Sequence, residues 1–157
     1  MLLLAGGCTS KFSPALERAL TNQSGSVSVT LYYPKPENYI LRQQSAAIII
    51  DKKTLFYLKR GEQITFYLSP GTHEIGVRQA FSSYFTRQHT LSITMEAEHS
   101  YYVRTYPVFE GITYIPYWFI PLPAPDMRFR LYEVSEEAAK RLMVGKPVDP
   151  KERVLDQ

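Results

Sequence analysis

The feature that most constrains the fold is an apolar period of two that begins at Val27 and recurs along most of the chain. From Val27 to Tyr33, apolar side chains occupy every second position and mostly hydroxyl-bearing residues lie between them. Successive side chains of a β-strand point to opposite faces, whereas a helical pattern repeats about every 3.6 residues. The pattern therefore predicts half-buried strands rather than helices.

Turn residues separate the later segments of this kind. Ser69, Pro70 and Gly71 form the clearest turn, because proline fixes φ and glycine accepts a positive φ. Many short strands at this spacing indicate an all-β protein, and we expect an antiparallel β-sandwich of the immunoglobulin or transthyretin type. The predicted strands cover residues 27–33, 46–50, 55–58, 64–68, 73–77, 91–95, 101–106 and 127–134.

One short C-terminal helix is expected to close this domain. Ser135 is a good N-cap, acidic residues follow it in the first turn, and Gly145 supplies a stop. The helical face expected to pack on the sheet contains Val134, Ala138 and Leu142.

The composition fits one globular domain. The chain has 157 residues, of which 45% are hydrophobic and 21% charged, and its net charge of +3 comes from dispersed basic residues. Dispersed charge gives no nucleic-acid footprint, and no apolar stretch reaches the roughly 18 residues that span a bilayer. A single cysteine excludes an intramolecular disulfide and the zinc sites that use paired cysteines.

That cysteine, Cys8, follows three leucines and three small residues. It precedes every periodic segment, so no core is available to bury it, and no basic neighbour would activate it for redox chemistry. The segment Leu-Leu-Leu-Ala-Gly-Gly-Cys resembles the lipobox of a bacterial lipoprotein signal peptide. The resemblance implies that Cys8 receives a diacylglycerol, becomes the N-terminus after cleavage and carries fatty acyl chains such as palmitate.

The segment before Cys8 is short for a signal peptide, which needs a basic start and an apolar run of roughly 7–15 residues. The apolar run here covers only Leu2 to Ala5, and the first basic residue, Lys11, follows the cysteine. We therefore expect either a start codon further upstream or a shortened chain. By resemblance to such lipoproteins, Thr9 after the cysteine implies sorting to the outer membrane.

The predicted organisation has four parts: a signal-peptide remnant with lipobox at 1–8, a polar tether at 9–26, the β-sandwich with its closing helix at 27–145, and a loose tail at 146–157. Residues Pro14 to Leu20 suit a short helix within the tether. A fully extended tether would reach on the order of 60 Å at ~3.4 Å per residue.

Residues that carry chemistry are sparse. No two of the three histidines, His73, His89 and His99, are spaced as metal ligands on one element, so we expect them to bond backbone groups at turns and strand ends. Glu96 and Glu98 bracket a turn and are expected to be solvated rather than a glycosidase pair. We predict no catalytic residue, no metal, no cofactor and no enzyme activity.

One stretch, PVFEGITYIPYWFIPLPAPD at 107–126, is unusual because it has no charge between Gly111 and Pro125. Two interpretations stay open. Its rings could cover or fill the sandwich core, or they could form an exposed patch for a protein partner or a membrane interface. The candidate contact residues are Tyr114, Tyr117, Trp118 and Phe119. The prolines are expected to keep this backbone from pairing freely.

Three segments together resemble a family of small bacterial lipoproteins that contain a PEGA-like β-sandwich domain of unknown function. They are LKRGEQITFYLSPGTHEIGV, ITMEAEHSYYVRTY and RFRLYEVSEEAAKRLM, and the resemblance covers roughly residues 26–143. In the first segment, Lys59, Gly61, Pro70, Gly71 and His73 match the family's turns. The family has no established catalytic residue, and the 107–125 stretch is longer than its usual connection.

The expected function is that of a lipid-anchored lipoprotein of the bacterial cell envelope, on the outer membrane and facing the periplasm. It would act as a non-catalytic binding or assembly module for an envelope protein or glycan, and not for nucleic acid. Two alternatives stay open: a cell-envelope glycan hydrolase, and a lipoprotein subunit of a secretion apparatus.

Overall fold

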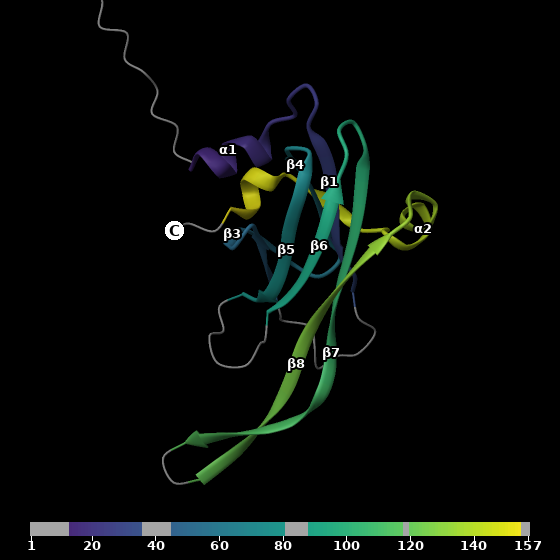
Figure 1. Cartoon of the computed structure of the whole chain (residues 1–157). Helices are drawn as coiled ribbons and strands as arrows, with labels where there is room; N and C mark the ends of the chain where they lie inside the picture. The colour runs from purple at the N-terminus through teal and green to yellow at the C-terminus, as the bar shows by residue number, and fades with distance from the viewer. Residues whose placement is uncertain (1–12, 36–44, 81–87, 118–119, 155–157) are drawn as a thin grey trace, which may run out of the picture.

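The protein is an all-β sandwich of two facing sheets with short helices at its margins (Figure 1). The computed structural model describes residues 13–35, 45–80, 88–117 and 120–154. Every strand predicted from the period-two pattern is present, some with longer bounds than expected. The predicted all-β fold class is therefore confirmed.

The larger sheet has five strands in the order β8-β7-β1-β4-β9. Its members are β1 (Val27–Tyr33), β4 (Glu62–Leu68), β7 (Ser100–Tyr117), β8 (Ile120–Val134) and β9 (Lys146–Val148). The pairs β1–β4 and β7–β8 are antiparallel, as expected. The pairs β1–β7 and β4–β9 are parallel, so this sheet is mixed and only part of it has the expected antiparallel pairing.

The smaller sheet has four strands, all antiparallel, in the order β3-β2-β5-β6. Its members are β2 (Ala46–Ile50), β3 (Lys53–Leu58), β5 (Gly71–Gln79) and β6 (His89–Met95). The connection between β2 and β3 is a two-residue turn in which Asp51 and Lys52 both have positive φ, of 48° and 68°. Turns of this kind match the twist of the strands that they join.

The core lies between the two sheets and consists of inward-facing residues from both. Its largest fully buried side chains are Tyr33, Phe56, Phe66 and Phe129. The rings of Phe56 and Phe66 lie 5.6 Å apart, and those of Tyr33 and Phe129 meet edge to face at 5.7 Å. Aromatic pairs in these geometries add to the stability gained from burial alone.

The first helix, α1 (Pro14–Leu20), forms where the sequence predicts one, with Ser13 as its N-cap. It is part of the domain rather than of a free tether, because Leu16 and Ala19 are buried in the core, at 5% and 1% exposure. The predicted 9–26 spacer therefore does not stand apart from the sandwich over its described part.

The second helix, α2 (Glu136–Leu142), begins at the predicted cap, Ser135, which accepts from the Ala138 amide at 3.3 Å. Its packing face agrees with the expected one at Val134, which packs against the cluster that contains Tyr32, and differs along the helix itself. Ala139 and Met143 are buried against Tyr32, whereas Leu142 is 47% exposed. The apolar pattern of so short a helix fits more than one face, and contact with the sheet selects among them.

The predicted loose tail is also ordered within its described part. Strand β9 pairs in parallel with β4, and η2 (Pro150–Arg153) follows it. Arg153 then forms an ion pair with Glu62, with Nη2 and Oε1 2.6 Å apart. This pair fixes the C-terminal segment to the edge of the larger sheet.

Candidate functional site

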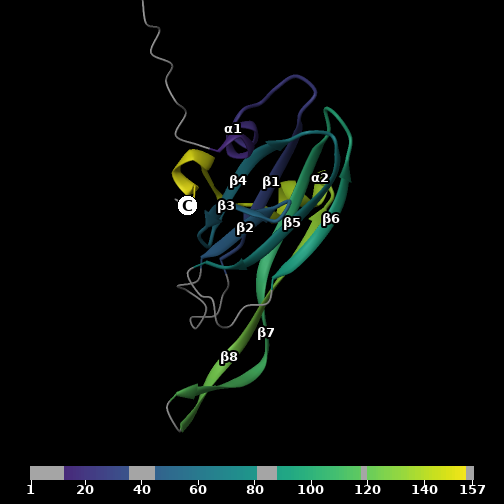
Figure 2. The same ribbon diagram turned by 60° about the vertical axis from the view of Figure 1, so that its left-hand side comes forward.

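Strands β7 and β8 continue past the sandwich as a two-stranded β-arm (Figures 1 and 2). We define the β-arm as Val108–Tyr117 of β7 paired with Ile120–Arg128 of β8. At ~3.4 Å per residue the β7 side is roughly 30 Å long. The arm leaves the end of the sandwich opposite α1, beyond the ends of β5 and β6 (Figure 1).

The prolines of the β-arm do not prevent pairing, contrary to the expectation from sequence. Pro116 faces Pro121 in the ladder, and Pro123 and Pro125 face Tyr114 and Ile112. Proline lacks an N–H, so within a ladder it suits positions whose N–H would point away from the partner strand. The β8 prolines occupy every second position, so the N–H groups that they lack would all point toward the same edge. We infer that this is the outer edge of β8, away from β7, because the two strands stay paired along this stretch.

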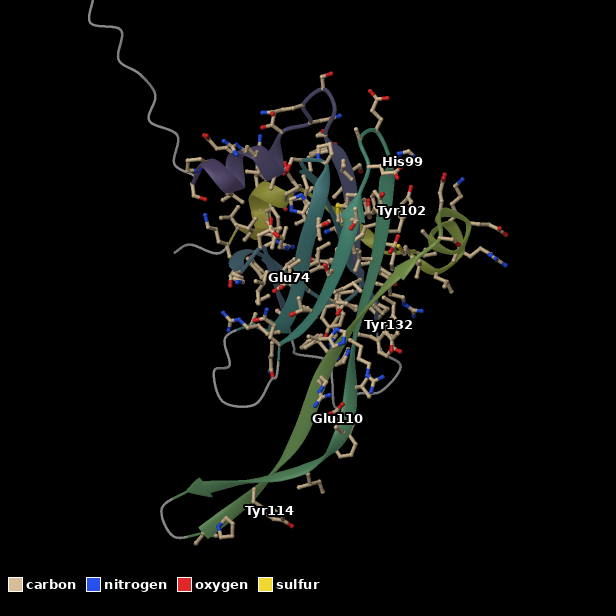
Figure 3. The ribbon with its side chains drawn as sticks, in the orientation of Figure 1. Glu74, His99, Tyr102, Glu110, Tyr114 and Tyr132 are labelled. Atoms are coloured by element: carbon tan, nitrogen blue, oxygen red, sulfur yellow. The ribbon has the colours of Figure 1, made fainter. Side chains whose placement is uncertain are left out.

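Four large apolar side chains of the β-arm are exposed rather than part of the core. Phe109, Ile112, Tyr114 and Ile120 have 57%, 63%, 66% and 66% of their surfaces accessible. Tyr114 extends from the distal part of the arm (Figure 3). An exposed cluster of large apolar residues on a protruding element is typical of an interaction surface. The interpretation in which the rings of the 107–126 stretch fill the sandwich core does not hold for these four residues.

The other three predicted contact residues of this stretch are Tyr117, Trp118 and Phe119. Tyr117 is the last residue of β7, and only its backbone is described. Trp118 and Phe119 lie outside the described residues, as does the predicted lipid-attachment site, Cys8.

At the base of the β-arm, charged and aromatic side chains form a second surface, which we call the root patch. Glu110 lies 3.0 Å from Arg128 and 3.9 Å from Arg130, measured from carboxylate oxygen to Nη2. The Tyr106 and Tyr132 rings stack with centroids 5.4 Å apart, and the Arg104 guanidinium lies 5.9 Å from the Tyr106 ring centre. In Figure 3, Glu110 lies nearer the tip of the arm and Tyr132 lies nearer the sandwich. The root patch consists of Arg104, Tyr106, Glu110, Arg128, Arg130 and Tyr132.

The two tyrosines of the root patch have opposite pKa shifts. Hydrogen bonding with Tyr132 raises the pKa of Tyr106, with a smaller contribution from desolvation. Hydrogen bonding with Tyr106 and then with Arg130 lowers the pKa of Tyr132. Tyrosine and arginine are the residue types that most often dominate binding energy in protein interfaces.

A groove of about 470 Å³ lies at the opposite end of the molecule, beside α1. Its lining includes Asp51, Ser69 and His73, which resemble a serine–histidine–aspartate set. The His73 Nδ1 is 2.7 Å from Asp51 Oδ2, and its Nε2 is 2.8 Å from the Ser69 carbonyl oxygen but 3.5 Å from the Ser69 hydroxyl. Both ring nitrogens therefore lie within hydrogen-bond distance of acceptors, the Asp51 carboxylate and the Ser69 carbonyl oxygen. The His73 ring thus connects the β2–β3 turn to the β4–β5 turn, and it does not present a lone pair to the Ser69 hydroxyl as a catalytic histidine would.

Asp51 has a structural role in the same connection between the two turns. Burial tends to raise the pKa of its carboxyl group, but the Glu74 amide and the His73 ring both hydrogen-bond to it and lower the pKa overall. The Asp51 carboxylate therefore already has two hydrogen-bond partners, both on β5.

The remaining candidates for chemistry are structural or solvated. His99 contacts the Ala97 carbonyl at 3.0 Å, and the His89 ring accepts from the Leu131 amide at 3.3 Å, so both bond backbone as expected. Glu96 and Glu98 are exposed at the turn between β6 and β7. Among the described residues, no three His, Cys, Asp or Glu side chains lie close enough to hold a metal ion.

Sequence reasoning missed Phe109, Ile112 and Ile120 as site residues, and it missed the root patch. A signal was available for the arm, because alternating and β-branched residues continue past Tyr106 on both sides of the 117–120 turn. The root patch has no local signal, since Arg104 and Tyr132 are brought opposite each other only by the register of β7 with β8.

No protein-family model, curated protein or solved structure matches this chain. Within the described ranges, neither α-helix is long and apolar enough to cross a membrane.

Proposed function

We propose that this protein is a lipid-anchored lipoprotein of the bacterial cell envelope that acts as a non-catalytic binding or assembly module. The observation that carries the proposal is the β-arm, which presents exposed apolar residues away from the sandwich. The lipobox-like segment that ends at Cys8 supplies the anchor.

The packing of α1 constrains the orientation that such an anchor would give. Because Leu16 and Ala19 belong to the core, the segment from Cys8 to Ser13 separates the anchor from the domain, and its fully extended length is at most about 17 Å at ~3.4 Å per residue. The α1 end would stay near the membrane, and the β-arm at the other end would point into the periplasm. This orientation favours a protein partner for the arm over the membrane that holds the anchor.

We expect replacement of the exposed apolar side chains Ile112 and Tyr114 with serine to abolish complexes between this protein and other envelope proteins. Both side chains are mostly exposed, so the thermal melting temperature should change little while the contact surface is lost. The measurement is chemical cross-linking in intact cells that carry the full-length gene, followed by purification and mass spectrometry.

The matched control replaces Leu142 and Val144 with serine, because these residues are also exposed apolar side chains but lie far from the arm, at the end of α2. The control should keep every complex that the wild type forms. If the complexes persist after Ile112 and Tyr114 are replaced, the β-arm is not the contact surface and this part of the proposed function is wrong.

A further inference from the structure

The outer edge of β7 is the open edge of the β-arm. Among the described residues, β7 pairs with β1 only from Ser100 to Arg104, and beyond that its ladder is with β8 alone. The corresponding edge of β8 has prolines at 121, 123 and 125, which cannot donate to an added strand. On β7, prolines occur at 107 and 116 and leave 108–115 free of them. One edge of the arm is thus available for strand addition and the other is blocked.

We propose that this open edge pairs with the same edge of a second copy of the chain, as an antiparallel two-stranded contact across a two-fold axis. Such a contact is self-complementary when the two-fold axis passes at Ile112, because the bulge lets Glu110 and Gly111 together take one position of the ladder. Pro107 then faces the second copy's Pro116, and Phe109 faces its Tyr114. Both bracketing prolines fall at the ends of the shared ladder, where no N–H is needed, and an aromatic pair forms on each side of the axis.

The charge and the shape of the arm suit a second copy. Glu110 is the only charged residue in 108–115, and Arg128 and Arg130 of its own hairpin already compensate it. It is also the bulged residue, at the point where the β7–β8 register shifts, so it interrupts the edge close to the axis. Antiparallel arms put the two sandwich bodies at opposite ends of the contact.

The blocked β8 edge limits the size of the assembly. An open edge on both strands would let copies add without end, whereas pairing through β7 alone uses the same surface on both copies and closes at two. The contact is small, so we expect a dimer that forms at roughly 10–100 µM protein, as for weak interfaces below about 1,200 Å². This inference does not depend on the lipid anchor.

The test uses purified full-length chain with Cys8→Ser, so that no native thiol is present. In this background Val108→Cys combined with Ile115→Cys should give a disulfide-linked dimer under mild oxidation, because the proposed register makes 108 and 115 direct cross-strand neighbours. Either cysteine alone should give at least tenfold less dimer, since each residue lies far from its own copy across the axis. Cross-linking by a single cysteine at the level of the pair would overturn the register.

A second variant tests strand addition itself. Tyr114→Pro removes one outward N–H opposite an existing proline, Pro123, so the hairpin ladder should survive. We expect this variant to lose the dimer in sedimentation equilibrium with an unchanged melting temperature, whereas Tyr114→Ala should retain part of it. A wild type that stays monomeric at 100 µM, a wild type that forms larger assemblies, or a dimer that persists in Tyr114→Pro would each refute the proposal. Because the sample holds this chain alone, these results are independent of capture of other envelope proteins.

Discussion

Phe66→Ala is expected to lower the free energy of unfolding by about 3–5 kcal/mol and the melting temperature by about 10 °C or more. Phe66 lies on β4, is fully buried and packs on Phe56 from the opposite sheet at 5.6 Å. Truncation removes this contact and leaves a cavity between two sheets that cannot close without moving both ladders. Urea unfolding followed by circular dichroism measures the loss.

The matched control is Phe109→Ala, which deletes the same atoms from the β-arm. Phe109 is 57% exposed, so this change should cost less than about 0.5 kcal/mol. A loss in Phe109→Ala as large as that in Phe66→Ala would mean that the arm packs into the core, and would contradict its description as a free surface.

Glu62→Gln is expected to cost about 3 kcal/mol of stability at neutral pH. The Glu62 carboxylate accepts from Arg153 Nη2 at 2.6 Å, from Arg153 Nε at 3.0 Å and from the Lys59 amide at 2.9 Å. Both side chains of the ion pair are nearly buried, at 10% and 14% exposure. Loss of the carboxylate charge leaves the Arg153 guanidinium uncompensated, which is far more costly than the loss of a surface pair.

The pH dependence of this effect has a definite sign. Burial tends to raise the pKa of Glu62, but the Arg153 hydrogen bonds, the Lys59 amide and the nearby positive charges lower it overall from its usual 4.5. A lowered pKa in the folded state contributes stability above the unfolded pKa and loses it as the pH falls through the folded value. The difference between wild type and Glu62→Gln should therefore shrink as the pH falls below about 4.5.

Glu136→Gln on α2 is the control for this charge pair. Glu136 and Lys140 are 63% and 72% exposed, so solvent screens this pair and its loss should cost far less than the loss of the Glu62 carboxylate. Equal losses in Glu62→Gln and Glu136→Gln would show that the tail is not fixed by the Arg153 contact.

The sandwich could be predicted from sequence because local pattern and burial agree in its strands. In β1, β4 and β6, inward positions alternate with outward ones, and the turn at Ser69–Gly71 has the residues that its backbone requires. The caps Ser13 and Ser135 likewise act within three residues along the chain. Such short-range signals are present in the sequence itself.

Features that depend on distant segments could not be predicted. The parallel pairs β1–β7 and β4–β9 join strands far apart in sequence, and periodicity gives no information on partners. The order of the tail depends on Glu62 and Arg153, which are 91 residues apart. The β-arm was unexpected because proline argues against a central strand. Only the pairing register of β7 with β8 shows that the prolines occupy alternate positions of a paired strand.

The most direct test of the proposed function is mass spectrometry of the N-terminal peptide of the full-length gene product, isolated from bacterial membranes. The account predicts a mature chain that begins at Cys8 and carries a diacylglycerol on its thiol. It also predicts that Cys8→Ser moves the protein to the soluble fraction, because several acyl chains at ~0.8 kcal/mol per buried CH₂ dominate membrane affinity. A membrane-bound protein with a free Cys8 thiol in an uncleaved N-terminal segment would contradict the account.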